Sequence, residues 1–325
     1  MTAFYPPDTK PSQKSRSTGR GGDRAVAFLT SSAGIAIIVT VVLVGVFLLW
    51  QAIPSVMADQ VSFLFSREWD VSDTDDLRFG ILDLLYTTVL SSVFAMALAV
   101  PVAIGIALYI TQYAPLKLAK PVAYVVDLLA AVPSIIFGLW GIIVLAPVIQ
   151  PVATFLNSTL GWFPLFGDGI KSPGTVFTAG VVLAIMILPI ITAISREVVD
   201  QTPLLNKEAA LALGATKWEA IKMVVLPFGK PGIISASMLG LGRALGETIA
   251  VMIILSKPAP NADFNPSLFA GGETFASKIA NNAAEFDSPE KTGAYIAAGL
   301  VLFILTFVVN AIARWVINRR KEYSE

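Results

Sequence analysis

The sequence lacks both cysteine and histidine. The absence of cysteine excludes disulfide bonds and thiolate nucleophiles. The absence of histidine excludes histidine-containing metal sites and every acid–base scheme that uses an imidazole. Carboxylates remain available, but Asp and Glu do not cluster inside any apolar segment. These absences argue against an enzyme, and we expect no metal site.

Charged residues are also scarce. They make up 14% of the 325 residues, whereas soluble domains contain about 25%. Hydrophobic residues make up 55%, and the net charge is zero. The balance predicts an integral membrane protein, and the lack of a basic field gives no reason to expect nucleic acid as a partner.

Long apolar segments are what the sequence does contain. A spanning helix needs roughly 20 largely apolar residues. Six segments meet this requirement, at about 27–53, 81–111, 121–150, 175–195, 231–255 and 294–318. The first has no convincing cleavage site and is interpreted as a retained helix. We therefore predict an all-α, polytopic protein with six transmembrane helices.

Lysine and arginine fall mostly in alternate loops, which orients the chain by the positive-inside rule. One side contains most of them: Lys10, Lys14, Arg16, Arg20, Arg24, Lys117, Lys120, Arg196, Lys207, Lys217, Lys222, Lys230, Arg314, Arg319, Arg320 and Lys321. The other side has only Arg67, Arg78, Lys171, Lys257, Lys278 and Lys291. Both termini and the 196–230 loop are therefore predicted to be cytoplasmic.

The chain divides into three predicted regions. Residues 1–24 are polar and aperiodic and are expected to form a disordered cytoplasmic arm. Residues 25–80 contain the first helix and an acidic outer loop, and residues 81–325 form the main membrane domain. The acidic loops at 54–80 and 256–293 are either solvated surfaces or a docking site for a partner.

Residues 207–227 form a charged, alanine-rich segment between two apolar segments, KEAALALGATKWEAIKMVVLP. Its apolar residues recur at helical spacing on both sides of Gly214. We predict two short helices that meet at a glycine turn and end at Pro227. From the pattern alone, the segment is either a docking surface or an amphipathic helix lying on lipid headgroups.

The spacing within this segment resembles the signature of bacterial ABC importer permeases. It consists of Glu208-Ala209-Ala210, three residues, Gly214, nine residues, Val224, one residue and the pair Leu226-Pro227. In that family the segment, here 205–227, is a coupling loop seated in a cleft of the ATPase subunit. The resemblance implies that Glu208 reaches a basic group of the ATPase, that Ala209 and Ala210 allow close helix approach, and that Gly214 forms the turn. Val224 stands where the family usually has Ile.

Two charges lie inside the fifth apolar segment. Arg243 and Glu247 are four residues apart, so on one helix they are able to pair. Arginine within a membrane span costs at least ~2.5 kcal/mol and faces a bundle interior or an aqueous path. Gly242 and Gly246 form a small-xxx-small pattern that predicts close helix packing. The pair either holds the bundle together or belongs to a path for an anion, which a guanidinium recognises with two parallel hydrogen bonds.

A narrower resemblance concerns GRALGETIA around these charges, AAVPSIIFGLWGI at 130–142 and ILPIITAISREVV at 187–199. These motifs look like those of phosphate-specific ABC permeases, of the longer first subunit type (PstC) rather than its partner type (PstA). The resemblance implies that Arg243 and Glu247 serve phosphate passage. Pro133 and Ser134 break the third segment, and the freed backbone groups either line the path or pack against protein.

The resemblance implies the type I importer fold and transport of inorganic phosphate across a bacterial inner or plasma membrane. No G-x-x-x-x-G-K-[ST] motif occurs, so ATP and Mg²⁺ are expected on a separate ATPase dimer, with no cofactor on this chain. A second homologous permease, an extracytoplasmic phosphate-binding protein and membrane lipid are the other expected partners. The alternatives are a permease for sulfate, molybdate or phosphonate, and, more distantly, a channel or secondary transporter.

Overall fold

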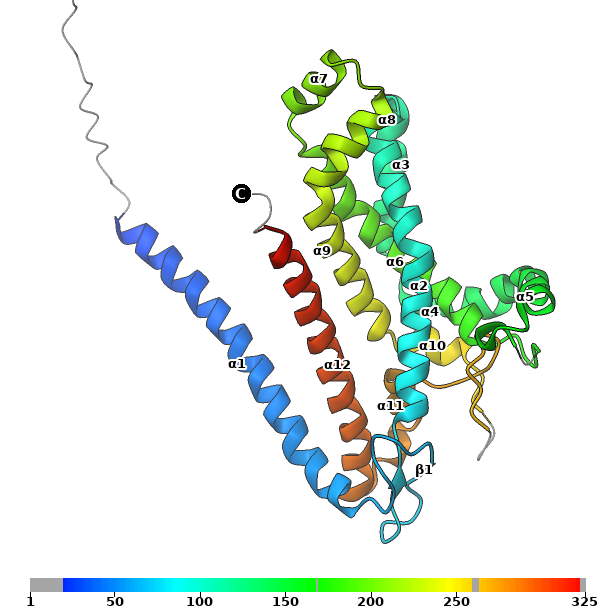
Figure 1. Cartoon of the computed structure of the whole chain (residues 1–325). Helices are drawn as coiled ribbons and strands as arrows, with labels where there is room; N and C mark the ends of the chain where they lie inside the picture. Colours follow the sequence, from blue (N-terminus) through cyan, green and yellow to red (C-terminus); the bar gives the residue numbers. More distant parts are fainter. Residues whose placement is uncertain (1–19, 168, 259–262, 322–325) are drawn as a thin grey trace, which may run out of the picture. The chain divides into compact units, whose positions relative to one another are not determined.

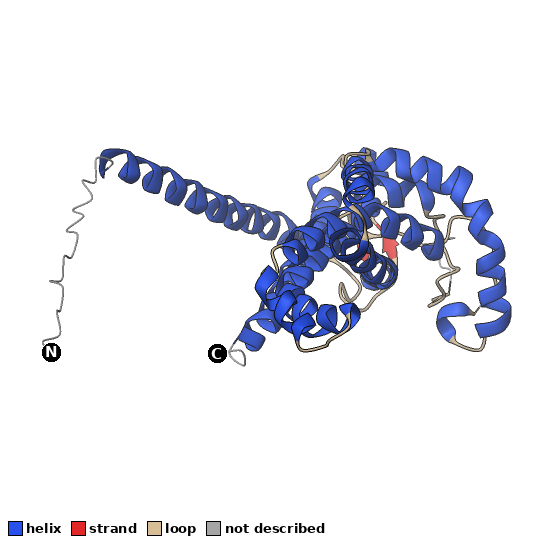
Figure 2. Cartoon of the chain, turned by 90° about the horizontal axis from the view of Figure 1, so that it is seen from above, coloured by secondary structure: helices blue, strands red, loops and turns tan. Residues whose placement is uncertain are grey.

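The computed structural model describes residues 20–167, 169–258 and 263–321. Helices dominate these ranges, and the strands form one short antiparallel hairpin (Figure 2). The helices up to the predicted cytoplasmic loop are α1 (Arg20–Ala58), α2 (Leu82–Leu108), α3 (Leu116–Ala130), α4 (Ser134–Trp140), α5 (Ala146–Leu160) and α6 (Val176–Asp200). They are followed by α7 (Leu204–Ala212), α8 (Lys217–Ala220), α9 (Leu226–Leu245), α10 (Ile249–Ile254), α11 (Phe275–Asn281) and α12 (Pro289–Lys321).

Shorter elements connect these helices. The hairpin pairs β1 (Trp69–Asp70) with β2 (Arg78–Phe79). Single π-helical turns continue α2, α4 and α8, at Tyr109–Tyr113, Gly141–Leu145 and Ile221–Val225. Two 3₁₀ turns occur at Pro164–Phe166 and Ala283–Glu285.

The chain separates into two compact units, residues 1–47 and 48–325. The described part of the first unit is helix α1 up to Phe47, with exposed apolar side chains such as Phe28, Leu29 and Ile37. Residues 1–19 of the predicted disordered arm lie outside the described residues. Residues 20–24, which the arm was predicted to include, belong to helix α1 instead.

Within the described residues, six helical segments are long and apolar enough to cross a membrane: Gly22–Ala58, Leu82–Tyr113, Ser134–Leu160, Val176–Asp200, Lys217–Leu245 and Pro289–Trp315. The predicted number of spans is therefore confirmed. Two predicted boundaries are wrong, because the third and fifth segments contain breaks. Pro133 disfavours helical backbone at the residue before it, so α3 ends at Ala130 and the third span begins at Ser134. The fifth helix ends at Leu245, and α10 restarts at Ile249.

The main core lies between α2 and α6. Ala95, Ala99 and Ala103 recur every four residues along α2 and are fully buried. They pack with buried α6 residues of the same cluster, including Leu183 and Ile187. Small side chains let two backbones approach closely, which is how membrane helices associate where lipid removes the hydrophobic drive. This close-packed pair fixes the helices that carry the candidate sites.

The second unit has two distinct ends. Helices α7 and α8 lie at one end, and the β-hairpin and α11 lie at the other (Figure 1). At the hairpin end, Trp69, Phe79 and Tyr295 form an aromatic cluster. There Arg67 binds Asp83 through two hydrogen bonds of 2.8 and 3.0 Å, which raise the pKa of the Arg67 guanidinium. The predicted cytoplasmic and outer loops thus occupy opposite ends.

Candidate functional site: a coupling loop and two helix breaks

The predicted coupling loop is a helix–turn–helix whose corner is fixed by backbone hydrogen bonds. Gly214 has φ +88°, a left-handed conformation that glycine adopts without steric cost. The Gly214 amide donates to the carbonyl of Leu211 at 3.0 Å, and the Ala215 amide donates to that of Ala210 at 3.1 Å. This pair of bonds is the Schellman arrangement that ends a helix. The first short helix and the glycine turn are therefore confirmed, whereas the second helix continues into the fifth span.

The second helix of the loop begins with a capping box. The Glu219 amide donates to Thr216 Oγ1, and the Thr216 amide donates to Glu219 Oε2, so two otherwise unpaired amides are satisfied. From Lys217 the chain stays helical through the π turn and into α9. The prediction that Pro227 ends this helix is wrong. Pro227 lies in the first turn of α9, where the missing N–H of proline is tolerated.

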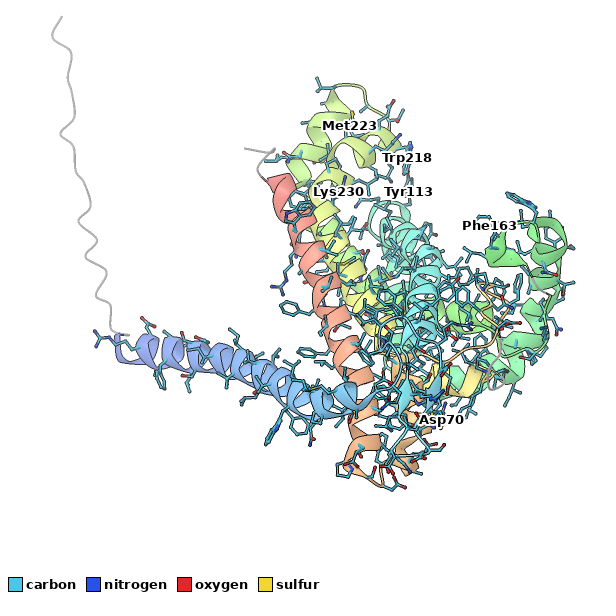
Figure 3. The ribbon with its side chains drawn as sticks, turned by 60° about the horizontal axis from the view of Figure 1, so that its bottom comes forward. Asp70, Tyr113, Phe163, Trp218, Met223 and Lys230 are labelled. Atoms are coloured by element: carbon cyan, nitrogen blue, oxygen red, sulfur yellow. The ribbon has the colours of Figure 1, made fainter. Side chains whose placement is uncertain are left out.

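The predicted coupling residues differ in exposure. Glu208, Ala209, Gly214 and Pro227 are exposed, whereas Leu226 is half-buried and Ala210 is buried within the chain itself. Apolar side chains are exposed beside them, at Leu204, Leu205, Leu211, Leu213, Trp218 and Met223. Figure 3 shows Trp218 and Met223 at the same end as Tyr113, whose ring lies 4.8 Å from Lys217 Nζ. An apolar surface of this kind at the end of a bundle is typical of a docking site.

The breaks in the third and fifth segments meet. Ser134, the first residue of α4, donates its hydroxyl to Glu247 Oε2 at 3.2 Å. Glu247 is buried, and its Oε1 accepts the Ala250 amide in the first turn of α10. At Gly138 the helices are so close that an added Cβ would lie 2.9 Å from Ala250 Cα. The structure therefore brings the predicted pathway residues Ser134 and Glu247 together.

Arg243 and Glu247 do not pair, contrary to the expectation from their spacing. Their four-residue separation would align them only on a continuous helix, and α9 ends at Leu245 between them. Glu247 turns toward α4 and α10 instead. Among the described residues, Arg243 forms no hydrogen bond or ion pair, and its Nε is buried without a partner. Arg196 of α6 also has one buried nitrogen without a partner, Nη1, but its Nη2 pairs with Asp127 of α3 at 3.3 Å.

Arg243 lines a groove of about 390 Å³ between α6, α9 and α12, together with Ile190, Met238, Leu239, Gly242 and Asn310. Gly242 faces open space in this chain, and the atom nearest to Gly246 belongs to Gly242. The predicted packing of a helix against Gly242 and Gly246 is therefore not found within the described residues. The close contacts of α9 are at Gly232, against Val198, and at Gly240, against Ile191.

Asn310 is the groove residue that the sequence prediction missed. It lies in the last apolar segment, VLFILTFVVNAIARWV, as the one amide among mostly aliphatic and aromatic residues, with Thr306 and Arg314 as the other polar ones. A polar residue inside a span is itself a signal for function, so the pattern offered a way to find it. No group of three or more acidic side chains gathers to hold a metal ion in the part of the chain that the structure describes.

Similar proteins match nearly the whole chain. A family model for the binding-protein-dependent transport system inner membrane component matches residues 99–322. A phosphate transport system permease protein PstC 2 of Mycobacterium tuberculosis is 57% identical over 91% of both chains. PstC proteins of Mycobacterium leprae (59% identical, covering 83% of this chain and 85% of the relative) and Xylella fastidiosa strain 9a5c (40%, 90% of both) are also similar.

Solved structures agree on the fold. A bacterial ABC transporter involved in import of the acidic polysaccharide alginate superposes with a TM-score of 0.56 at 16% identity, covering 92% of this chain and 98% of that one. The MetNI methionine ABC transporter superposes with a TM-score of 0.50 at 20% identity, covering 74% and 94%. The fold is thus that of ABC transporter permeases, with six spanning segments in a multi-pass inner membrane protein. The chain belongs to the family of binding-protein-dependent transport system inner membrane components.

Proposed function

We propose that this chain is a transmembrane subunit of an ATP-driven importer of inorganic phosphate. The observation that carries the proposal is its similarity over 91% of both chains to a phosphate transport permease, at 57% identity. The groove supports phosphate as the transported substrate. An unpaired guanidinium within a membrane span is stabilised by an anion, and its planar fork fits a tetrahedral oxyanion. Glu247 accepts hydrogen bonds from Ser134 and Ala250 and forms no ion pair with Arg243 among the described residues.

The α7–α8 loop is the proposed contact with the ATPase. Its exposed apolar side chains supply a hydrophobic contact area, and exposed Glu208 supplies a charge for a basic group of the partner. The Schellman turn and the capping box make the loop a rigid elbow that is continuous with α9. Closure of the ATPase dimer, which would bind ATP and Mg²⁺, would therefore move the helix that carries Arg243.

Two further partners complete the proposed importer. A second, homologous permease would face α9, where Gly242 and Arg243 lie open in this chain. An extracytoplasmic phosphate-binding protein would dock at the hairpin end, opposite the α7–α8 loop (Figure 1). Both termini would be cytoplasmic, as the distribution of lysine and arginine predicts.

Uptake of radiolabelled phosphate tests this function directly. Cells that lack the chain should lose uptake at low micromolar phosphate, and expression of the chain should restore it. Excess unlabelled phosphate should compete, whereas excess sulfate, molybdate or phosphonate should not. Equal uptake with and without the chain would refute phosphate import. Competition by sulfate at similar concentration would favour a permease for another oxyanion.

A further inference from the structure

The groove that contains Arg243 also contains an amide whose orientation is fixed. Asn310 lies on α12 and lines the same groove as Arg243 of α9. Its amide nitrogen donates to the backbone carbonyl of Thr306 at 2.9 Å. A carbonyl only accepts, so the group facing Thr306 must be the NH₂ and not the oxygen. The carbonyl oxygen of Asn310 therefore points away from its own helix and remains available as an acceptor.

An amide oxygen without a hydrogen-bond partner is energetically unfavourable at this position. Asn310 is exposed, and the nearby α12 residues Phe307, Val308 and Ile312 expose large apolar side chains. A polar group inside a membrane span is costly unless it has a partner or faces an aqueous path. Arg243 lines the same groove, and its guanidinium forms no hydrogen bond or ion pair among the described residues. One side of the groove thus offers donors with positive charge, and the other offers a neutral acceptor.

We propose that Asn310 determines specificity by accepting a hydrogen bond from the O–H of a protonated tetrahedral oxyanion held by Arg243. Inorganic phosphate keeps at least one P–O–H at neutral pH, and arsenate keeps the equivalent As–O–H. Sulfate is fully deprotonated, so it can only accept hydrogen bonds, and it would leave the oxygen of Asn310 unpaired. The phosphodiester of a phospholipid also lacks an O–H and would be rejected for the same reason.

The chemistry of the amide explains why this position carries neither a carboxylate nor an apolar residue. A carboxylate would accept the P–O–H but would repel the anion and weaken the field of Arg243. An apolar side chain would let sulfate and phosphate bind equally. A site that hydrogen-bonds the substrate hydroxyl discriminates strongly, because the analogue lacking that hydroxyl leaves a desolvated polar group unpaired. This inference rests on the proposed function and names the group, the amide oxygen of Asn310, that distinguishes phosphate from sulfate.

Anion binding to the purified transporter complex, without any binding protein, tests the inference. Thermal shifts are recorded in millimolar phosphate, arsenate or sulfate, with Arg243→Ala giving the non-specific salt effect. Wild type should bind phosphate and arsenate about tenfold more tightly than sulfate, as one hydrogen bond permits. Asn310→Leu should bind all three alike, and Asn310→Asp should bind each more weakly than Asn310→Leu does. Unchanged discrimination in Asn310→Leu overturns the inference.

Whole-cell uptake provides the second readout and separates the two proposals. Gln150→Leu is the matched control, since it replaces an exposed amide on α5 that lies outside the groove. Phosphate uptake should fall severalfold in Asn310→Leu and stay within about twofold of wild type in Gln150→Leu. If wild type does not import phosphate, the proposed function fails. If wild type imports phosphate and Asn310→Leu does so equally well, only the role of Asn310 fails.

Discussion

The α7–α8 loop exposes apolar side chains, whereas the meeting point of α4 and α10 buries polar ones. The loop is held by bonds between near neighbours in sequence, such as the Schellman turn at Gly214 and the capping box at Thr216. The helix breaks are held by a bond across 113 positions, from Ser134 to Glu247. Local bonds therefore fix the shape of the loop, and its second helix is also anchored on the bundle by Ile221 and Val225. Glu247 joins the two breaks, because it accepts hydrogen bonds from Ser134 of α4 and from Ala250 of α10.

Disruption of the proposed contact between the α7–α8 loop and the ATPase should have the largest effect on phosphate uptake. Glu208→Lys reverses an exposed charge at the proposed ATPase contact, so phosphate uptake should fall to background while the chain still inserts. Uptake and co-purification with the ATPase measure this outcome. Asp200→Lys is the control, because it makes the same charge change at an exposed position just before the loop. Normal ATPase binding by Glu208→Lys would rule out the docking assignment.

Arg243→Lys should have the next largest effect. It keeps the charge but removes the planar fork, and the loss of charge-assisted hydrogen bonds should lower phosphate uptake about 10- to 100-fold. Arg196→Lys is the matched control, since Arg196 pairs with the half-exposed carboxylate of Asp127, and such a pair contributes about 1 kcal/mol or less. Equal phosphate uptake by the two variants would show that Arg243 does not bind the oxyanion through its guanidinium fork.

Ser134→Ala should affect stability more than transport. It removes one hydrogen bond to a buried carboxylate, so the free energy of unfolding should fall by about 1–3 kcal/mol, and the melting temperature of the complex should fall by several degrees. Ser158→Ala on α5 is the control, because that hydroxyl bonds only to a carbonyl of its own helix. Equal melting of both variants would contradict a role for the contact between the two breaks.

Gly214→Ala should have the smallest effect. Alanine in the left-handed region costs about 1–2 kcal/mol. This cost should loosen the turn between α7 and α8 and reduce phosphate uptake severalfold, without unfolding the membrane helices. Limited proteolysis of the loop measures the opening. Gly105→Ala in α2 has open space and no positive φ, and it should be neutral or slightly stabilising. Identical cleavage of the Gly214→Ala variant and wild type would show that the turn tolerates a side chain.

The same contrast explains what the sequence predicts well and what it does not. The short helix before Gly214, the turn and the start of the next helix were predictable, because glycine, threonine and glutamate act within a few residues of one another. The break at Pro133 followed from proline alone. The separation of Arg243 from Glu247 was not predictable, because it depends on α4 supplying Ser134 as a distant partner. The position of Asn310 in the same groove as Arg243 was not predictable, because it depends on how α9 and α12 pack.

The unpaired charge of Arg243 also has an electrical consequence. An anion moving inward travels toward the negative side of the membrane, at a cost of about 2.3 kcal/mol per elementary charge for each 100 mV. A guanidinium already neutralised by Glu247 would contribute nothing against this cost. Glu247 accepts hydrogen bonds from Ser134 and Ala250 and forms no ion pair with Arg243 among the described residues, so under the proposed function the guanidinium would keep its hydrogen-bond donors for the anion. Under the proposed function, the end of α9 at Leu245 would prevent an ion pair between Arg243 and Glu247, and the guanidinium would then offset part of this cost.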